Sequence, residues 1–442
     1  MLDYSVRVGE YDEELPDSSI PENIGGNPFP GLRPFTIDES HLFFGREGQV
    51  DEILLKLSHH RSVTIMGYSG SGKSSLMHCG LIPVLYGGFM TETSPYWQIV
   101  LSRPGDSPIR NLTNSIVSHL ITNGKIEESD REIHKAIINS VLHSGPDGLV
   151  EITKFLQNRT DENIFILIDQ FEELFRYSEI SDEYSNEAIA FVNLILHAVH
   201  QKEVPLYLAI NMRSDFIGDC SLYPGLTQMI NASNYLVPQM TREQMKLAVM
   251  GPVAVGGGRI SGRLIKRLIN DIGGSQDQLP ILQHALMRTW DYWVENHDQA
   301  EPMDIRHYNA VGKISQALSL HANEAFDELT VREREIAEVL FKSITEKNQE
   351  NQGLRRPCKI NKIAELSEAS PQEVIKVADH FRKGGRSFLM PGAQVTLTSD
   401  SVIELSHESM MRIWTRLQDW VNEEYDSAQM YKNCRELRHY TK

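Results

Sequence analysis

Cysteine is scarce in this chain of 442 residues, and the four that it contains, Cys79, Cys220, Cys358 and Cys434, are scattered. They form no Cys-x-x-Cys pair, and no histidine cluster has metal-ligand spacing, so a disulfide framework and a structural zinc site are both disfavoured. No apolar run approaches the roughly 18 residues that a membrane-spanning helix needs. Residues 1–14 are acidic and lack the apolar stretch of a signal peptide. These absences predict a cytoplasmic protein without a membrane partner.

A surplus of basic residues is also lacking. The chain has 43 Lys and Arg against 60 Asp and Glu, a formal net charge of −17, and an isoelectric point of about 5.4. Nucleic-acid phosphates demand clustered Lys and Arg. This balance therefore makes nucleic acid an unexpected partner, although it does not exclude a local basic face. Hydrophobic residues at 40% and charged residues at 23% are ordinary for a globular protein, and the length predicts roughly two to three domains.

The first half of the chain has the pattern of an α/β domain. Residues 1–34 are acidic and then rich in Gly and Pro, which predicts an extended or disordered lead-in without room for a folded N-terminal domain. Residues 35–237 alternate helical patterns with continuous apolar runs, which is typical of a parallel sheet covered on both faces. The expected strands are 62–66, 97–101, 164–168 and 206–210.

Helical patterns dominate the second half. Residues 238–329 predict a helical lid domain, with helix caps at Thr241 and Ser261. Residues 330–407 predict a winged-helix domain, because helices precede short strands there. Residues 408–442 predict a single long amphipathic helix. The short strands are expected at 387–390, 394–398 and 402–405, and core positions are expected for Trp290, Trp293, Trp414 and Trp420.

The most specific motif follows the first expected strand and opens a helix. The segment GYSGSGKS at residues 67–74 satisfies G-x-x-x-x-G-K-[ST], the pattern of a nucleotide-binding P-loop. In such a loop, backbone N–H groups surround the β-phosphate, the lysine neutralises phosphate oxygens and the last hydroxyl ligates Mg²⁺. The expected nucleotide ligands are Gly67, Ser69, Gly70, Ser71, Gly72, Lys73, Ser74 and Ser75. The predicted fold is therefore an α/β P-loop NTPase domain with a parallel sheet, followed by the lid and the winged helix.

A second motif fits the Walker B pattern. The apolar run at 164–168 ends in Asp169, which a buried strand would deliver beside Mg²⁺ together with Ser74. Glu172 and Glu173 follow, and one of them is expected to orient the attacking water. Acidic residues are also favoured in the first turn of any helix, so the sequence does not say which glutamate is catalytic.

Two basic features carry alternative interpretations. Arg213 follows the expected strand 206–210, where a cation is expected to contact the γ-phosphate; the alternative is a surface arginine paired with Asp215. Arg355 and Arg356 belong to a basic stretch that could face DNA, or could lie at an internal interface or on a solvated face.

Several sequence blocks together resemble the STAND class of P-loop NTPases, which includes NACHT and NB-ARC proteins. The resemblance is strongest to the novel STAND clade, commonly fused to tryptophan-aspartate propeller repeats, and it covers about Asn27 to Trp420. Besides the P-loop, the blocks are NPFPGLRPF at 27–35, LFFGRE at 42–47, IDQFEELF at 168–175, QLPILQHAL at 278–286 and ELSHESMMRIW at 404–414.

The resemblance implies roles that spacing alone does not. Phe44, Gly45 and Arg46 match the segment that lies against the adenine base and ribose. Pro280 matches a proline whose helix packs over the nucleotide; by itself it reads as a proline at the start of a helix. His407 matches the winged-helix histidine that holds the ADP β-phosphate in the closed state; by itself it reads as a capping residue.

The expected function is a switch that binds ATP or ADP with Mg²⁺, hydrolyses ATP slowly and forms a homo-oligomer when active, in bacterial signalling or antiphage defence. A separate effector and a C-terminal sensor, which the last helix would lead to, are expected outside this chain. The alternatives are an ATP-dependent DNA-binding loader and a nucleotide-binding scaffold that does not hydrolyse. The activating ligand and the oligomer number stay open.

Overall fold

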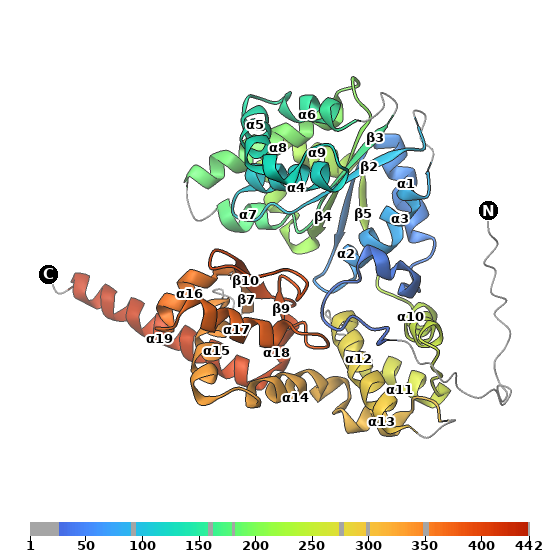
Figure 1. The fold of residues 1–442 in the computed structure, drawn as a ribbon, viewed down its shortest axis with the longest axis vertical. Coiled ribbons are helices and arrows are strands. Elements are labelled where there is room, and N and C mark those ends of the chain that lie inside the picture. Colours follow the sequence, from blue (N-terminus) through green and yellow to red (C-terminus); the bar gives the residue numbers. More distant parts are fainter. Residues whose placement is uncertain are drawn as a thin grey trace.

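The computed structural model describes residues 26–89, 94–157, 162–178, 182–273, 278–297, 301–347 and 353–440. It is an α/β P-loop NTPase fold followed by a helical lid and a winged helix (Figure 1). Most of the expected lead-in, residues 1–25, lies outside the described residues. Among the described helices, none combines the length and apolar composition required to cross a bilayer.

A parallel sheet of five strands forms the centre of the NTPase part, in the order β2-β3-β4-β1-β5. Alternate side chains of its strands enter separate cores. Ile164 and Ile166 pack against one set of helices, whereas Phe165 and Leu167 pack against the other. The strands are β1 (Ser62–Gly67), β2 (Trp97–Ser102), β3 (Asn163–Ile168), β4 (Leu206–Arg213) and β5 (Asn234–Leu236).

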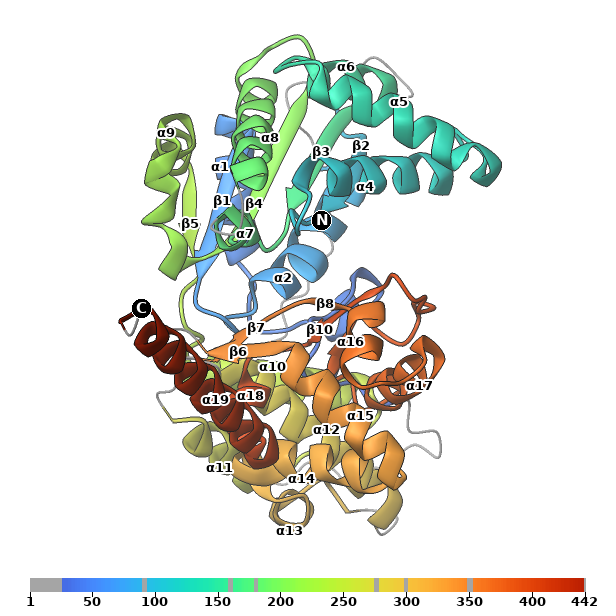
Figure 2. The same cartoon turned by 90° about the vertical axis from the view of Figure 1, so that its left-hand side faces the viewer.

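Helices cover both faces of this sheet (Figure 2). One face carries α4 (Pro108–Thr122), α5 (Arg131–His143), α6 (Gly148–Leu156), α8 (Asp182–His200) and α9 (Pro224–Ala232). The other carries α1 (Gln49–His60), the π-helical segment Leu76–Leu81 and α3 (Ile82–Tyr86). The shorter elements are the 3₁₀ turns Ile37–Leu42, Glu128–Asp130, Ser214–Phe216 and Asp219–Leu222, and the helices α2 (Lys73–Ser75) and α7 (Glu173–Ser178).

The lid packs around two tryptophans, as the sequence predicts: Trp290 is 1% exposed and Trp293 is 0% exposed. The predicted caps also form, because the side chain of Thr241 accepts from the N–H of Gln244 and that of Ser261 from the N–H of Leu264. The lid helices are α10 (Arg242–Val255), α11 (Gly262–Ile272), α12 (Gln278–Asn296) and α13 (Ile305–Ala310), and α14 (Lys313–Asp327) leads to the winged helix (Figure 1).

The winged helix combines three helices with a three-stranded antiparallel sheet in the order β8-β10-β9. A separate hairpin of β6 and β7 precedes it. The elements are α15 (Val331–Ser343), β6 (Thr345–Lys347), β7 (Gly353–Arg355), β8 (Cys358–Lys359), α16 (Ile360–Leu366), α17 (Pro371–Arg382), β9 (Leu389–Met390) and β10 (Val402–Leu405).

Residues 394–398 form no strand, so the strand expected there is wrong. The Arg382 side chain, 2% exposed, occupies the backbone acceptors of this loop instead, because its guanidinium donates to the carbonyls of Pro391, Gly392 and Val395. The strand that pairs with β9 is β10, with Glu404 opposite Met390.

The single C-terminal helix expected at 408–442 is also wrong. Helix α18 (Ser409–Ile413) ends at Trp414, whose backbone is extended, and α19 (Thr415–Tyr440) starts after it. The Trp414 side chain is fully buried and its indole N–H donates to Asn323 at 2.8 Å. Burial of this indole against α14 fixes the break.

Residues 27–35, here called the strap, form no helix or strand; they turn at Gly31 and Leu32 and are packed rather than disordered. Phe29 is buried in the lid core and lies edge-to-face against Trp290. Leu32 belongs to the winged-helix core. Phe35 reaches the NTPase part, where its ring meets Phe43. The strap therefore joins all three parts of the molecule.

Candidate functional site

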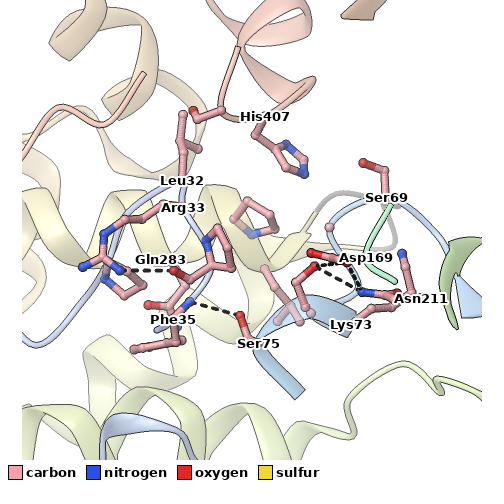
Figure 3. Close-up of a pocket in the computed structure, with 18 of the residues that line it drawn as sticks. Leu32, Arg33, Phe35, Ser69, Lys73, Ser75, Asp169, Asn211, Gln283 and His407 are labelled. Atoms are coloured by element: carbon pink, nitrogen blue, oxygen red, sulfur yellow. Dashed lines mark hydrogen bonds between the residues drawn. The ribbon is translucent and has the colours of Figure 1, made fainter. Parts of the chain in front are cut away.

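A cavity lies where the NTPase sheet, the lid and the winged helix meet (Figure 3). Most of the expected site residues line it, from all three parts of the chain: Phe44, Arg46, Ser69, Gly70, Gly72, Lys73, Ser74, Ser75, Asp169, Glu172, Arg213, Pro280 and His407. Gly67, Ser71, Gly45 and Glu173 do not line this cavity.

The P-loop starts at Gly67, the last residue of β1, and curls around its own lysine. Lys73 Nζ donates to the carbonyls of Gly67 at 2.9 Å and Tyr68 at 2.8 Å. Burial lowers the pKa of Lys73, and the nearby carboxylates of Glu172 and Asp169 oppose that shift. Gly70, with φ +71°, takes a left-handed backbone conformation that glycine adopts without strain.

Gly70 also has no room for a side chain. A Cβ atom at this position would lie 3.1 Å from Cδ of Pro280 and 3.2 Å from Nε2 of His407. Pro280 is the third residue of α12, within the first turn, where a missing N–H costs no helical hydrogen bond. The lid and the winged helix therefore both close directly on the phosphate loop.

A hydroxyl and a carboxylate meet at the ends of β3 and β4, beside Lys73. Ser74 Oγ donates to Asp169 Oδ1 at 3.1 Å. Asn211 Nδ2 donates to the same carboxylate oxygen at 2.5 Å. Asp169 Oδ2 is buried and has no hydrogen-bond partner among the described residues. A serine hydroxyl and a carboxylate with a spare oxygen are ligands that Mg²⁺ accepts, so the residues present fit this ion.

Asn211 and Arg103 were not anticipated from the sequence. Parallel pairing places Ser102 opposite Ile168 and Ile168 opposite Ile210, so the next residue of each strand meets Asp169. Both residues lie at the carboxyl ends of strands, and the carboxyl ends of parallel strands share one edge of the sheet. Their positions in the sequence therefore indicate that they lie near Asp169.

The two candidate glutamates lie in different surroundings. Glu172 is 6% exposed and lines the cavity; its Oε2 accepts the N–H of Arg213 at 3.2 Å. Burial raises its pKa, against the pull of Lys73. Glu173 begins α7 and accepts the N–H of Gly105 at 2.9 Å. Burial, together with the charge of Glu404, raises the pKa of Glu173 to about 7.

Phe44, Gly45 and Arg46 stand at the apolar end of the cavity. The Phe44 ring packs on Gly251 of α10, where a Cβ would come within 2.4 Å of the ring. A Cβ on Gly45 would lie 2.4 Å from the carbonyl oxygen of Gln244 in the same helix. Arg46, 4% exposed, donates to the carbonyls of Ser71 at 2.8 Å and Pro238 at 2.7 Å. Its pKa is lowered to about 10 by burial. Arg46 thus holds the P-loop against the connection to the lid.

Ser75 also has a structural partner. Its hydroxyl accepts the N–H of Phe35 at 3.2 Å, which ties the P-loop helix to the strap (Figure 3). At the other end of the strap, Asn27 Nδ2 donates to Met287 O at 2.9 Å and to Asp291 at 2.8 Å. Residues 30–35 of the strap line the cavity between these anchors.

His407 faces the P-loop from the winged helix. Its Nδ1 accepts the N–H of Ser409 at 3.1 Å, which places the proton of the neutral ring on Nε2. Nε2 is buried and has no partner among the described residues. Burial, then the charges of Arg355, Lys73 and Arg213, lower the pKa of His407 to about 3, so the ring is neutral at physiological pH. His407 therefore caps the helix through Nδ1 and directs the N–H donor at Nε2 toward the P-loop.

Two arginines pair with carboxylates beside the cavity, Arg213 across the interface and Arg355 within the winged-helix part. Arg213, at the end of β4, pairs with Asp215 at 2.5 Å and with Glu408 of the winged helix at 2.5 Å. Arg355, from the basic stretch, lies 3.6 Å from Glu404 and donates to Leu405 O at 3.3 Å. Arg355 therefore lies at an internal interface, whereas its neighbour Arg356 is exposed.

Solved structures are similar to this chain at low sequence identity. No match to the chain was found among curated protein sequences. Among solved structures, the Aeropyrum pernix ORC1 protein in complex with DNA is 8% identical, with 86% of this chain and 93% of that chain covered and a TM-score of 0.43. The A. pernix ORC2 protein is 10% identical, with coverages of 86% and 94% and a TM-score of 0.44. A Walker-type ATPase of Pyrococcus abyssi is 12% identical, with coverages of 87% and 99% and a TM-score of 0.41.

The family comparison covers most of the chain. The sequence model described as Novel STAND NTPase 1 matches residues 28–440, which include all of the strap except Asn27, the P-loop, Asp169 and the winged helix. The chain therefore belongs to the novel STAND NTPase 1 family.

Proposed function

We propose that this chain is a nucleotide-dependent switch that holds ADP in a closed state, exchanges it for ATP, hydrolyses ATP slowly and self-associates when the winged helix moves away. The observation that carries the proposal is the buried Nε2–H of His407, a donor without a described partner that faces Gly70 of the P-loop. A buried, unsatisfied donor is costly, and a phosphate oxygen in the cavity that both residues line would satisfy it.

Other residues at the cavity would make the remaining contacts with the nucleotide and its metal. The backbone N–H groups of the P-loop and Lys73 would bind phosphate oxygens, and Lys73 would exchange its present carbonyl partners for them. Ser74 and Asp169 would hold Mg²⁺, which when bound neutralises phosphate charge. Phe44 and the strap would enclose the base.

Coupling to the winged helix would run through Arg213. In the closed state Glu408 neutralises its guanidinium. A γ-phosphate is a stronger, bidentate acceptor, so Arg213 would exchange Glu408 for it and release the winged helix. A ligand shifts such an equilibrium only by its difference in affinity for the two states, and ATP and ADP differ by this phosphate.

Glu172, rather than Glu173, is proposed as the catalytic glutamate, because it lines the cavity and Glu173 does not. Single-turnover hydrolysis should fall by about 100-fold or more in Glu172→Gln, as expected when a general base is lost, and should change little in Glu173→Gln. The opposite result would reverse the assignment. Retained ADP with no turnover in the wild type would favour the non-hydrolysing scaffold.

The central experiment identifies the nucleotide that copurifies with the chain. It also measures the mass of the protein in solution with ADP and with a non-hydrolysable ATP analogue. His407→Ala should release ADP about tenfold faster, consistent with loss of one or two hydrogen bonds, and should self-associate more readily. His59→Ala, an exposed histidine on α1, serves as the control. If His407→Ala stays monomeric and releases ADP at the wild-type rate, the proposal fails.

The biological setting belongs to the same proposal. Membership of the family supports bacterial signalling or antiphage defence, with effector and sensor modules of unknown identity. We expect no duplex DNA binding, since Arg355 is engaged inside the molecule. A salt-dependent shift of duplex DNA that is lost in an Arg356→Ala, Lys359→Ala double variant would instead support the DNA loader.

A further inference from the structure

Arg103 stands between the proposed metal site and the winged helix. It follows β2 directly, and the pairing of β2 with β3 sets it beside Asp169. Its Nη2 lies 3.7 Å from Asp169 Oδ2, and its Nη1 lies 3.8 Å from Oε1 of Glu404, on β10 of the winged helix. One guanidinium thus bridges carboxylates from two parts of the chain.

These contacts do not hold the Arg103 guanidinium in one fixed position. Both distances are too long for direct hydrogen bonds, and the Arg103 side chain is 38% exposed, so the attraction is electrostatic and not fixed by geometry. Asp169 Oδ2 has no hydrogen-bond partner in the described part of the chain. Glu404 is shared with Arg355 at 3.6 Å.

We propose that Arg103 is a positioning residue that couples occupancy of the metal site to the position of the winged helix. This inference rests on the proposed function, because it requires Mg²⁺ at Ser74 and Asp169. A divalent cation there and the Arg103 guanidinium compete for the same carboxylate, and like charges repel at this range. Metal binding therefore drives Arg103 away from Asp169, and Glu404 determines how easily it leaves.

The sign of the coupling follows from the two ion pairs. Removing the charge of Glu404 leaves Asp169 as the carboxylate at ion-pair distance from Arg103, so the guanidinium competes more strongly with the metal. Glu404→Gln should weaken metal binding although Glu404 is on another domain. Arg103→Gln removes the competitor and should strengthen it.

The test uses the full chain saturated with ADP, and Mn²⁺ as the probe, with free Mn²⁺ followed by electron paramagnetic resonance. Glu404→Gln should lower Mn²⁺ affinity about two- to fivefold, the range for a partly exposed ion pair, and Arg103→Gln should raise it similarly. Glu346→Gln, an exposed winged-helix glutamate on β6, should have no effect. In the Arg103→Gln background, Glu404→Gln should also have none.

The double variant separates coupling from a direct field of Glu404. A direct effect would persist without Arg103, and that persistence would overturn the proposal. Should Arg103→Gln not fold, Arg103→Lys keeps the charge and should retain the effect of Glu404→Gln in the same direction; loss of the effect there would also overturn the proposal.

Linkage supplies a second readout. If Glu404 changes metal affinity by a given factor, the metal must change the engagement of Glu404 by the same factor. Because charged Glu404 favours metal binding, Mn²⁺ should strengthen the pairing of Glu404 with Arg103. Mn²⁺ should therefore lower hydrogen exchange of β10 in the wild type and leave it unchanged in Arg103→Gln. If the wild type binds no ADP, the proposed switch fails. If the wild type binds ADP, and its Mn²⁺ affinity equals that of Glu404→Gln, only the coupling fails.

Discussion

The Arg213 guanidinium lies 2.5 Å from the Glu408 carboxylate and joins the end of β4 to the winged helix. The two side chains are only 18% and 5% exposed, so the pair is shielded from water. We expect Glu408→Gln to speed ADP release about tenfold, because Arg213 would keep its pairing with Asp215 of its own domain and lose the shielded charge pair that joins it to Glu408. Displacement of a fluorescent ADP analogue measures the rate, and Glu346→Gln is the control. An unchanged rate would show that this pair does not hold the closed state.

Gly70→Ala tests the close approach of three parts of the chain. The added methyl group would press on Pro280 and His407 at 3.1 to 3.2 Å and would also strain a backbone with φ +71°. Gly124→Ala is a matched control, since Gly124 has φ +66° and open space around its Cβ position. Both variants should lose about 1 kcal/mol from the backbone conformation. Isothermal titration should show weaker ADP binding only for Gly70→Ala, and equal affinities would contradict the observed contact.

The pH dependence of stability should report on Glu173. Its pKa of about 7 in the folded protein exceeds the ordinary value of 4.5. The folded state therefore keeps a proton that the unfolded chain releases, and this contribution to stability falls as pH rises from about 4.5 to 7. Glu173→Gln removes it, so its free energy of unfolding relative to wild type should rise by about 2 kcal/mol between pH 5 and pH 8. Urea unfolding at both pH values measures the difference, and a constant difference would refute the raised pKa.

Leu32→Ala tests the strap. Leu32 is 3% exposed within the winged-helix core, and truncation of a buried leucine costs about 2–4 kcal/mol. We expect faster hydrogen exchange in the winged helix and a lower thermal midpoint. Leu320→Ala, at a leucine 44% exposed on α14, should change stability by less than about 0.5 kcal/mol. Similar midpoints for both variants would show that Leu32 does not stabilise this domain.

Local patterns in the sequence predict most of the NTPase part and two helix starts of the lid. The strand before Gly67, the buried strand before Asp169 and the caps at Thr241 and Ser261 all depend on neighbouring residues, and the structure contains each of them. β5 was not predicted, because its three residues, Asn234–Leu236, are too few to show a periodic pattern.

Distant contacts account for what the sequence missed. Residues 394–398 form a loop and no strand, because Arg382 of α17 donates to the carbonyl of Val395. The C-terminal helix breaks because Trp414 is buried against Asn323. Within the site, residue types and motifs point to Lys73, Ser74 and Asp169. Arg103 carries no motif, and only the register of β2 against β3 brings it to Asp169.

The strap sets a limit on how far the parts of this molecule can separate. Phe29 lies in the lid core and Leu32 in the winged-helix core, only three positions apart in the sequence. An extended chain spans at most about 3.6 Å per residue, so the backbone positions of Phe29 and Leu32 are never more than about 11 Å apart. While both side chains remain in their cores, this distance also limits how far the lid core can move from the winged-helix core. A larger swing of the winged helix requires one of them to leave its core, and the length of three residues thus sets the range of motion available before any hydrophobic contact is broken.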